Sequence, residues 1–418
     1  MRIGVVDGFS TGAALAATLV ERGATCFHIA SSPQMNGFFT ASHRPELYLG
    51  QLVAADRRRL PDAVARWGLD AVVPGTESGV ELADALAWAL GLPGNRPSRE
   101  HVRRNKDAMA AAVAAAGLRT PRGAVLGDPA AVAAWTAEAG LAATVVKPLR
   151  SAGTDNVWFC NSPEAAATAA KQILAAQTVY GELNARVLVQ ERITGREFYL
   201  NSVSLDGRHR HAEVWEYRKS VNPWGNPVYD HEDPVRPGSP EWAALTAFCE
   251  RALDALGVRH GASHTEVFLT GEGEPVFIET GARLGGGTVP ALVERHCGVS
   301  QTALAADALL DPEAFLRHDE RRFCGRGTAV RNVALVNRRP GTAGPLDWLD
   351  RWRTLESWVD IRHGIVPGDP LPETRDLLSS PGFVYLASDD PRRLEADYRR
   401  IRDDERADAY LDTTESDR

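Results

Sequence analysis

Over the first 95 residues, short β-branched apolar runs alternate with longer stretches that are rich in alanine and leucine. The short runs predict strands, and the longer stretches, in which apolar residues recur every three or four positions, predict helices. The predicted strands are residues 2–7, 25–30 and 70–74, and the predicted helices are residues 11–22, a stretch within 45–67, and 77–90. This alternation is typical of a Rossmann-like α/β domain with a parallel sheet.

Beyond residue 95 the predicted strands and helices follow a less regular order. The predicted helices are residues 105–116, 163–176, 239–256, 289–295, 302–309 and 392–402. The predicted strands are residues 143–149, 157–160, 186–193, 198–205, 209–217 and 329–337. Asp206 and Gly207 separate two of these strands and predict a tight hairpin turn.

Two more strand-like segments, residues 264–269 and 275–280, flank a Gly/Glu turn. With a two-residue loop at Glu272 and Gly273, Glu266 lies directly opposite Glu279, and their Cβ atoms are roughly 5 Å apart. Like charges in this arrangement are destabilising, and a divalent cation that prefers oxygen ligands relieves the repulsion. The pair therefore predicts a Mg²⁺ site. The alternative is a surface hairpin with two solvated glutamates.

Composition narrows the class of protein. The 418 residues are too many for one ordinary core and predict several compact units, and the net charge of −8 argues against nonspecific binding to nucleic acid or anionic membranes. Five scattered cysteines without CxxC spacing are typical of a reducing compartment. No apolar run reaches the roughly 20 residues needed to span a bilayer, and no signal-peptide pattern is convincing. We expect a cytoplasmic protein without nucleic-acid or membrane partners.

The common local motifs of catalysis are missing from the sequence. It contains no GxxxxGK[ST] phosphate loop, no HExxH zinc motif, no GxSxG nucleophile elbow and no GxGxxG dinucleotide fingerprint. Two lysines nevertheless suggest anion binding. Lys147 ends a strand just before a small Ser/Gly loop, and Lys106 opens a helix, where the positive end of the dipole attracts anions. The alternatives are that Lys147 is a strand-end lysine before an ordinary hairpin turn and that Lys106 is a solvated surface lysine.

Four motifs, in a fixed order between residues 92 and 290, together resemble the ATP-grasp superfamily. They are Gly94-Asn95 with Asn105-Lys106-Asp107, then VVKPLRSAGTDNV, then VQERITGREF, and finally HTEVFL followed by PVFIETGARLGG. The last motif, with its long C-terminal extension, is most similar to the L-amino-acid ligase branch of the bacilysin-synthetase type. It is less similar to the carboxylases and the purine-pathway members.

The resemblance implies a Rossmann-like domain followed by an ATP-grasp fold of two α+β subdomains and a β-rich lid segment. The expected domains are residues 1–95 (Rossmann-like), 96–195 (small subdomain with a glycine-rich flap), 196–324 (large subdomain with the metal site) and 325–418 (C-terminal subdomain).

The resemblance also implies roles for individual residues. Those that would contact ATP are Lys106, Lys147, Ser151, Gly153, Gln190, Glu191, Ile193 and Glu197. In the family, backbone groups at the positions of Glu191 and Ile193 receive adenine, and Glu197 contacts the ribose. Glu266 and Glu279 would hold Mg²⁺, with Mn²⁺ as a substitute, and Arg283 and Lys147 would be catalytic. Two positions depart from the family: Gly281 replaces a frequent asparagine ligand, and Gln190 replaces a frequent glutamate.

Substrate contacts are expected from Arg283, Gly285, Gly286, Lys219, Glu77 and His264. Lys219 belongs to an aromatic-rich segment, residues 213–230, that either covers the site or forms a mobile surface loop. His264 is either a substrate contact or a satisfied, partly buried histidine. Glu77 follows a predicted parallel strand, at the sheet edge where ligands tend to bind, or it complements a helix dipole.

The resemblance implies an ATP-dependent carboxylate–amine ligase that forms an amide through an acyl phosphate and releases ADP and phosphate. Its partners would be a small carboxylate and an amine, and a homodimer is one open option. Three alternatives remain from the sequence: an ATP-grasp carboxylase or nucleotide-pathway ligase, a nicotinamide-binding oxidoreductase, and a catalytically silent nucleotide-binding module. The sequence does not name the two substrates.

Overall fold

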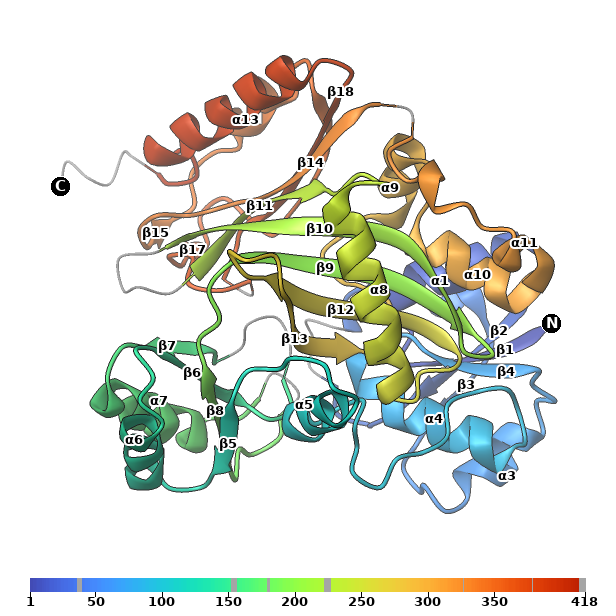
Figure 1. Ribbon diagram of the computed structural model, residues 1–418. Coiled ribbons are helices and arrows are strands. Elements are labelled where there is room, and N and C mark those ends of the chain that lie inside the picture. The colour runs from blue at the N-terminus through green and yellow to red at the C-terminus, as the bar shows by residue number, and fades with distance from the viewer. Residues whose placement is uncertain are drawn as a thin grey trace.

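The computed structural model describes residues 1–35, 40–151, 156–178, 181–221, 227–325, 327–377 and 379–412. Its N-terminal unit is a parallel sheet of four strands in the order β3-β2-β1-β4 (blue in Figure 1). The elements are β1 (Arg2–Val6), α1 (Thr11–Glu21), β2 (Thr25–Ala30), η1 (Pro45–Leu47), β3 (Tyr48–Val53), α3 (Leu60–Ala65), β4 (Ala71–Pro74), η2 (Glu77–Gly79) and α4 (Val80–Ala89). The three predicted strands and the parallel pairing are confirmed.

Strand β3 was not predicted, because it lies inside the stretch that was expected to be helical. Helix α3 does occupy part of that stretch. The sequence does not predict this strand because it lies at the edge of the sheet and most of its apolar residues are not buried. Leu49 is 70% exposed and Val53 is 49% exposed, whereas Tyr48 is buried. Alternation of apolar and polar residues therefore gave no signal there.

The first turn of α1 touches the loop that follows β4 at the carboxyl edge of this sheet. A Cβ on Gly12, in that first turn, would lie only 2.5 Å from the Cα of Gly75, so the two segments approach this closely only because residue 12 is glycine. Ligands of parallel sheets bind at this edge.

The second unit is a four-stranded antiparallel sheet in the order β5-β8-β6-β7, with α6 and α7 beside it (green in Figure 1). Its elements, with the preceding helix, are α5 (Lys106–Ala115), β5 (Gly123–Leu126), α6 (Pro129–Glu138), β6 (Thr144–Pro148), β7 (Trp158–Cys160), α7 (Pro163–Ala175) and β8 (Val187–Glu191). Helix α7 buries alanines and one isoleucine at helical spacing, at Ala166, Ala169, Ala170 and Ile173.

The third unit is built on an eight-stranded sheet in the order β13-β12-β9-β10-β11-β14-β18-β16. Its first part contains β9 (Arg196–Leu205), β10 (Arg208–Val221), β11 (Pro227–Pro234), α8 (Pro240–Ala255), β12 (Gly261–Leu269), β13 (Pro275–Gly281), α9 (Pro290–Cys297), α10 (Gln301–Leu310), α11 (Pro312–Leu316) and η3 (Glu320–Arg322). The predicted turn is confirmed, with Asp206 and Gly207 both at positive φ. Ser239 caps α8 by accepting a hydrogen bond from the N–H of Trp242.

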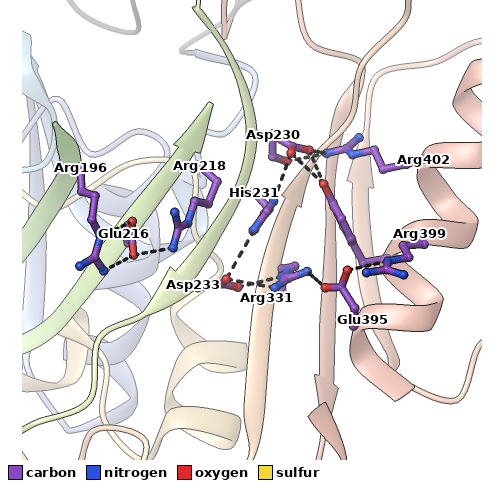
Figure 2. Close-up of polar contacts among 11 residues, drawn as sticks. Arg196, Glu216, Arg218, Asp230, His231, Asp233, Arg331, Glu395, Arg399 and Arg402 are labelled. Atoms are coloured by element: carbon purple, nitrogen blue, oxygen red, sulfur yellow. Dashed lines mark hydrogen bonds and ion pairs between the residues drawn. The ribbon is translucent and has the colours of Figure 1, made fainter. Parts of the chain in front are cut away.

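The C-terminal segment continues this same sheet through the pairing of β11 with β14. Its elements are β14 (Ala329–Ala334), β15 (Gly341–Thr342), α12 (Asp347–Trp352), β16 (Trp358–His363), β17 (Pro370–Leu371), β18 (Gly382–Ser388) and α13 (Pro391–Arg406). Ion pairs between β11 and this segment fasten one side of the sheet, and they include contacts from Arg331 to Asp233 and from Arg402 to Asp230 (Figure 2). The four proposed domain ranges stay predictions. Among the described residues, no helix combines the length and apolar character needed to cross a bilayer.

Candidate active site

One cavity of about 400 Å³ lies where the three units meet. The predicted site residues that line it are Glu77, Lys106, Lys147, Ser151, Gln190, Glu191, Ile193, Glu197, Lys219, His264, Glu266, Glu279, Arg283 and Gly286. Gly153 lies outside the described residues, and Gly285 is not part of the lining. The fold therefore gathers residues from positions 77 to 286 around a single space.

Glu266 and Glu279 face each other across the β12–β13 ladder, as the sequence predicted. The predicted two-residue loop is wrong, because the ladder closes at Leu269 and Pro275 and leaves a five-residue connection between them. A register shift next to Glu266 compensates for this longer loop. It inserts one extra residue on β13, and this bulge restores the opposition of the two carboxylates.

The carboxylates are surrounded by lysines. Lys106 Nζ lies 3.0 Å from Glu279 Oε2 and donates a hydrogen bond of 2.8 Å to the carbonyl of Ser151. Lys147 is buried at the end of β6. Burial, together with repulsion from Lys106, lowers the pKa of Lys147, while the charge of Glu279 opposes that shift. A buried lysine cation beside a small loop is a strong point charge for a phosphate.

Glu266 is held ionised by its surroundings. Burial alone would raise the pKa of its carboxyl, but the nearby His264 and the charges of Lys219 and Lys106 lower that pKa to about 2. His264 Nε2 lies 3.7 Å from Glu266 Oε1, and its Nδ1 is hydrogen-bonded to the amide oxygen of Asn201 at 2.8 Å. The histidine therefore lies beside the carboxylate and has a second, buried partner.

The donor set of Glu266 and Glu279 fits a hard divalent cation, because both groups are carboxylates on directly opposed positions. The ammonium of Lys106 is a cation next to Glu279. Gly281 adds no side-chain oxygen, and no set of three or more His, Cys, Asp or Glu side chains arranged to hold a metal exists in the described part of the chain. Phosphate oxygens and water would have to complete the coordination.

A different set of lining residues has the features expected of a nucleotide base site. Gln190, Glu191 and Ile193 line the cavity at and just after the end of β8, together with Val145 and Phe159. The N–H of Glu191 donates to the carbonyl of Arg122 at 2.7 Å, so a nucleotide would meet the carbonyl of Glu191 and not its N–H.

Glu197 and Lys219 form a buried ion pair on β9 and β10. The ammonium of Lys219 donates to both carboxylate oxygens of Glu197, at 2.8 and 2.7 Å, and lies over the ring of Tyr229. Burial raises the pKa of Glu197 even though Lys219 acts to lower it. Lys219 was expected to meet a substrate carboxylate, but in this structure its partner is Glu197. The mobile-loop alternative for residues 213–230 is wrong wherever that segment is described, because it is paired in β10 and β11.

Arg283 is fixed by a glutamate that lies 206 residues away in the chain. Its Nε donates to Glu77 Oε2 at 3.0 Å, and Arg104 Nη1 lies 2.9 Å from the other oxygen of Glu77. Burial by itself would raise the pKa of Glu77, but Arg104 and Arg283 reverse this effect and lower it. The guanidinium of Arg283 is thereby held at the cavity wall.

This arrangement explains why Gly281 departs from the family pattern. A Cβ at this position would lie 2.7 Å from Glu77 Oε2 and 3.2 Å from the guanidinium of Arg283. The space that a side chain would fill is already taken by the carboxylate from the N-terminal unit. Glu77 was predicted to contact substrate; its contacts in the structure are with two arginines.

Gly285 and Gly286 differ in what they can offer a substrate. The N–H of Gly285 donates to the side-chain oxygen of Gln301 at 2.8 Å, so it is already used within the protein. Gly286 and Gly287 line the cavity. A role for Gly285 as an anion donor therefore loses its support, because its donor group has a buried partner.

Some residues of the site were not predicted from the sequence. Arg104 lies two positions before Lys106, its side chain is only 4% exposed, and it contacts Glu77 without lining the cavity. Leu377 and Phe383 of the C-terminal segment line the cavity, and no local pattern marks them. Tyr217 and Tyr229 also line it, and they belong to the aromatic-rich segment, residues 213–230, for which covering the site was one of the two expectations.

Comparisons with known proteins identify relatives of the whole chain. Residues 104–216 match the family described as phosphoribosylglycinamide synthetase, ATP-grasp (A) domain. The chain is 31% identical to dapdiamide A synthase of Enterobacter agglomerans over 421 residues, covering 97% of this chain and 96% of that protein. It is 21% identical to the L-arginine-specific L-amino acid ligase of Bacillus subtilis over 261 residues, covering 60% of this chain and 59% of that protein.

The fold is also similar to a solved structure. The L-amino acid ligase of Bacillus licheniformis superposes with a TM-score of 0.76 at 20% sequence identity, and the match covers 96% of this chain and 97% of that one.

Proposed function

The chain belongs to the ATP-grasp ligases, and from this premise we propose that it joins a small amino-acid-like carboxylate to an amine. It is an ATP-dependent carboxylate–amine ligase. The finer assignment to amino acids is supported by the names of two relatives, a dapdiamide synthase and an L-arginine-specific L-amino acid ligase.

One observation carries the proposal. Two opposed carboxylates, two lysines and an arginine fixed by a distant glutamate converge on a single cavity, at Glu266, Glu279, Lys106, Lys147 and Arg283. That combination suits phosphoryl transfer, in which positioning and charge stabilisation supply most of the catalysis.

In the proposed first step, a substrate carboxylate attacks the γ-phosphorus of ATP and gives an acyl phosphate and ADP. Lys106 and Lys147 would neutralise phosphate charge, and Gln190, Glu191 and Ile193 would hold the base. A bound Mg²⁺ at Glu266 and Glu279 would supply further charge neutralisation. The predicted flap around Ser151 and Gly153 would exclude water from the acyl phosphate.

In the second step, the amine attacks the acyl carbon and phosphate leaves. Negative charge develops on the carbonyl oxygen, and the guanidinium of Arg283 would stabilise it. Glu77 keeps that guanidinium in place before substrate arrives, because both oxygens of its carboxylate are bonded to arginines. Preorganised donors of this kind lower the barrier because they need no rearrangement during the reaction.

The decisive experiment is a matrix of amino acids, offered in pairs with ATP and Mg²⁺, in which ADP release is measured and products are identified by mass spectrometry. Amide products with stoichiometric ADP would support the proposal, and Glu279→Gln should abolish both signals. ADP release that requires bicarbonate would instead favour a carboxylase. ATP binding without turnover by any pair would favour a silent nucleotide-binding module.

We also propose a cytoplasmic location, because the five cysteines are all free and buried. A homodimer stays a prediction, and light scattering of the purified protein would test it.

A further inference from the structure

The glycine loop at the cavity wall, residues 285–287, is held by side chains of the C-terminal segment. The hydroxyl of Tyr385 donates to the carbonyl of Gly287 at 3.1 Å, and the side-chain amide of Asn332 donates to the same carbonyl at 3.4 Å. Tyr385 lies on β18 and Asn332 on β14, both in the C-terminal segment. Two donors from one segment therefore converge on a single carbonyl of the loop.

Asn332 is itself held by a second buried side chain, that of Glu232. Its amide nitrogen donates to Glu232 Oε2 at 2.9 Å, and the hydroxyl of Tyr199 donates to the same oxygen at 2.9 Å. The ring of Tyr199 lies 5.0 Å from that of His264, which lines the cavity. The buried contacts thus run from the C-terminal segment, through Glu232 and Tyr199, to His264, the neighbour of the Glu266 carboxylate.

The strand register makes this arrangement rigid. Glu232 is paired with Asn332 between β11 and β14, and Asn332 is paired with Tyr385 between β14 and β18. Residues directly opposite in a ladder point to the same face of a sheet. Three neighbouring strands therefore aim these side chains at the same face, and all three residues are buried.

Three consecutive glycines have many accessible backbone conformations, and Gly287 adopts a φ of +77°. A loop of this kind keeps one conformation only where outside contacts select it, and a binding site that is populated for part of the time binds correspondingly more weakly. Tyr385 and Asn332 both contact this loop at Gly287, the last of its three glycines.

We propose that Tyr385 and Asn332 are positioning residues, through which the C-terminal segment holds the glycine loop in the conformation that receives the acid or amine substrate. This inference rests on the proposed function. It gives the C-terminal segment a role in substrate binding and none in nucleotide binding.

The test compares two variants that each remove one tyrosine hydroxyl from the C-terminal segment. Tyr385→Phe removes the bond to Gly287. The matched control, Tyr398→Phe, removes bonds to Asp230 on the side of the sheet shown in Figure 2. Amide hydrogen exchange over residues 284–289 needs no substrate, so it reports on the loop whether or not the ligase activity is found.

We expect Tyr385→Phe to accelerate exchange in this loop by about tenfold and to raise the KM of one substrate about five- to tenfold, while the Kd for ATP changes less than twofold. Tyr398→Phe should leave all three quantities near wild type. Unchanged exchange in Tyr385→Phe would overturn the positioning role. Faster exchange with unchanged KM values in an active ligase would overturn its link to substrate. Absence of any amide product from wild type, with faster loop exchange in the variant, would instead refute the proposed function alone.

Discussion

Two charged clusters lie on opposite faces of the eight-stranded sheet, and lysines predominate among the cations of one and arginines among those of the other. The inner cluster, around the cavity, consists of Glu197, Glu266 and Glu279 with Lys106, Lys147 and Lys219. The outer cluster, between β11 and the C-terminal segment, consists of Asp230, Asp233 and Glu395 with Arg331 and Arg402 (Figure 2). Arg331 and Asn332 are neighbours on β14, so their side chains point to opposite faces.

The difference in cation corresponds to a difference in purpose. Arg331 donates from Nε and Nη2 to both oxygens of Asp233, and Arg402 bridges Asp230 and Glu405. Such forked contacts have fixed geometry and leave little capacity for another ligand. A lysine is a compact charge on a flexible stem, so Lys106 is suited to exchange Glu279 for a phosphate in the proposed reaction. The lysines of the inner cluster are suited to exchange one anionic partner for another. The arginines of the outer cluster are suited to hold β11, β14 and α13 together.

The strongest test of the difference between the two clusters is a substitution of Glu279 in the inner cluster. We expect Glu279→Gln to lower ADP release about 1000-fold, a loss of about 4 kcal/mol in transition-state stabilisation, because the amide keeps the shape but removes the charge. The rate is measured with a coupled ADP assay. Glu274→Gln, an exposed glutamate near the turn of the same hairpin, should stay within twofold of wild type. Wild-type turnover by Glu279→Gln would disprove the assigned site.

In the outer cluster, removal of a cation should affect stability and leave catalysis intact. Arg402→Met leaves Asp230 and Glu405 without their buried partner, so we expect the free energy of unfolding to fall by about 4 kcal/mol. Urea denaturation measures this change. The control is Arg399→Met, whose side chain is 73% exposed, with an expected change of about 0.5 kcal/mol or less. Equal effects of the two substitutions would contradict the comparison.

Glu232 tests how a buried carboxyl behaves when its hydrogen-bond partners are the neutral side chains of Tyr199 and Asn332. Burial raises its pKa from 4.5 to about 7. The folded protein then binds this proton more tightly than the unfolded chain, so its contribution to the free energy of unfolding falls as pH rises from about 4.5 to about 7 and is constant above that range.

The fall associated with Glu232 is on the order of 3 kcal/mol. Glu232→Gln keeps an acceptor for both donors and should remove this pH dependence. The free energies of unfolding of wild type and Glu232→Gln are measured by urea denaturation at pH 5 and pH 8. The contributions of other titrating groups cancel in the difference between the two proteins at each pH. The same difference at both pH values would show that Glu232 does not titrate in this window.

The smallest expected effect comes from substitution of Lys147. It distinguishes a role in ATP binding from a role in binding the acid substrate. We expect Lys147→Ala to weaken ATP binding about 100-fold, or about 2.7 kcal/mol, and to change binding of the acid substrate less than threefold. Calorimetric titration measures both. Lys171→Ala, on the exposed face of α7, serves as the control. Equal weakening for nucleotide and acid would argue against a phosphate role.

The sequence by itself determined the features that depend on neighbours along the chain. The order of four motifs indicated the superfamily, and one hairpin placed Glu266 opposite Glu279. That prediction held even though its loop was wrong, because a bulge of one residue compensated for the longer connection. Periodicity identified most helices, since burial of one face leaves a regular pattern in the sequence.

Tertiary structure alone decided the contacts between segments that are far apart in the chain. It brought Glu77 to Arg283, filled the space beside Gly281, and paired β14 with β11 and β18 with β14. It also revealed β3, whose exposed apolar residues gave no alternation. The physical reason is that hydrophobic periodicity records only which face of an element is buried. The partner that covers that face is selected by packing across the whole chain, and no local pattern encodes it.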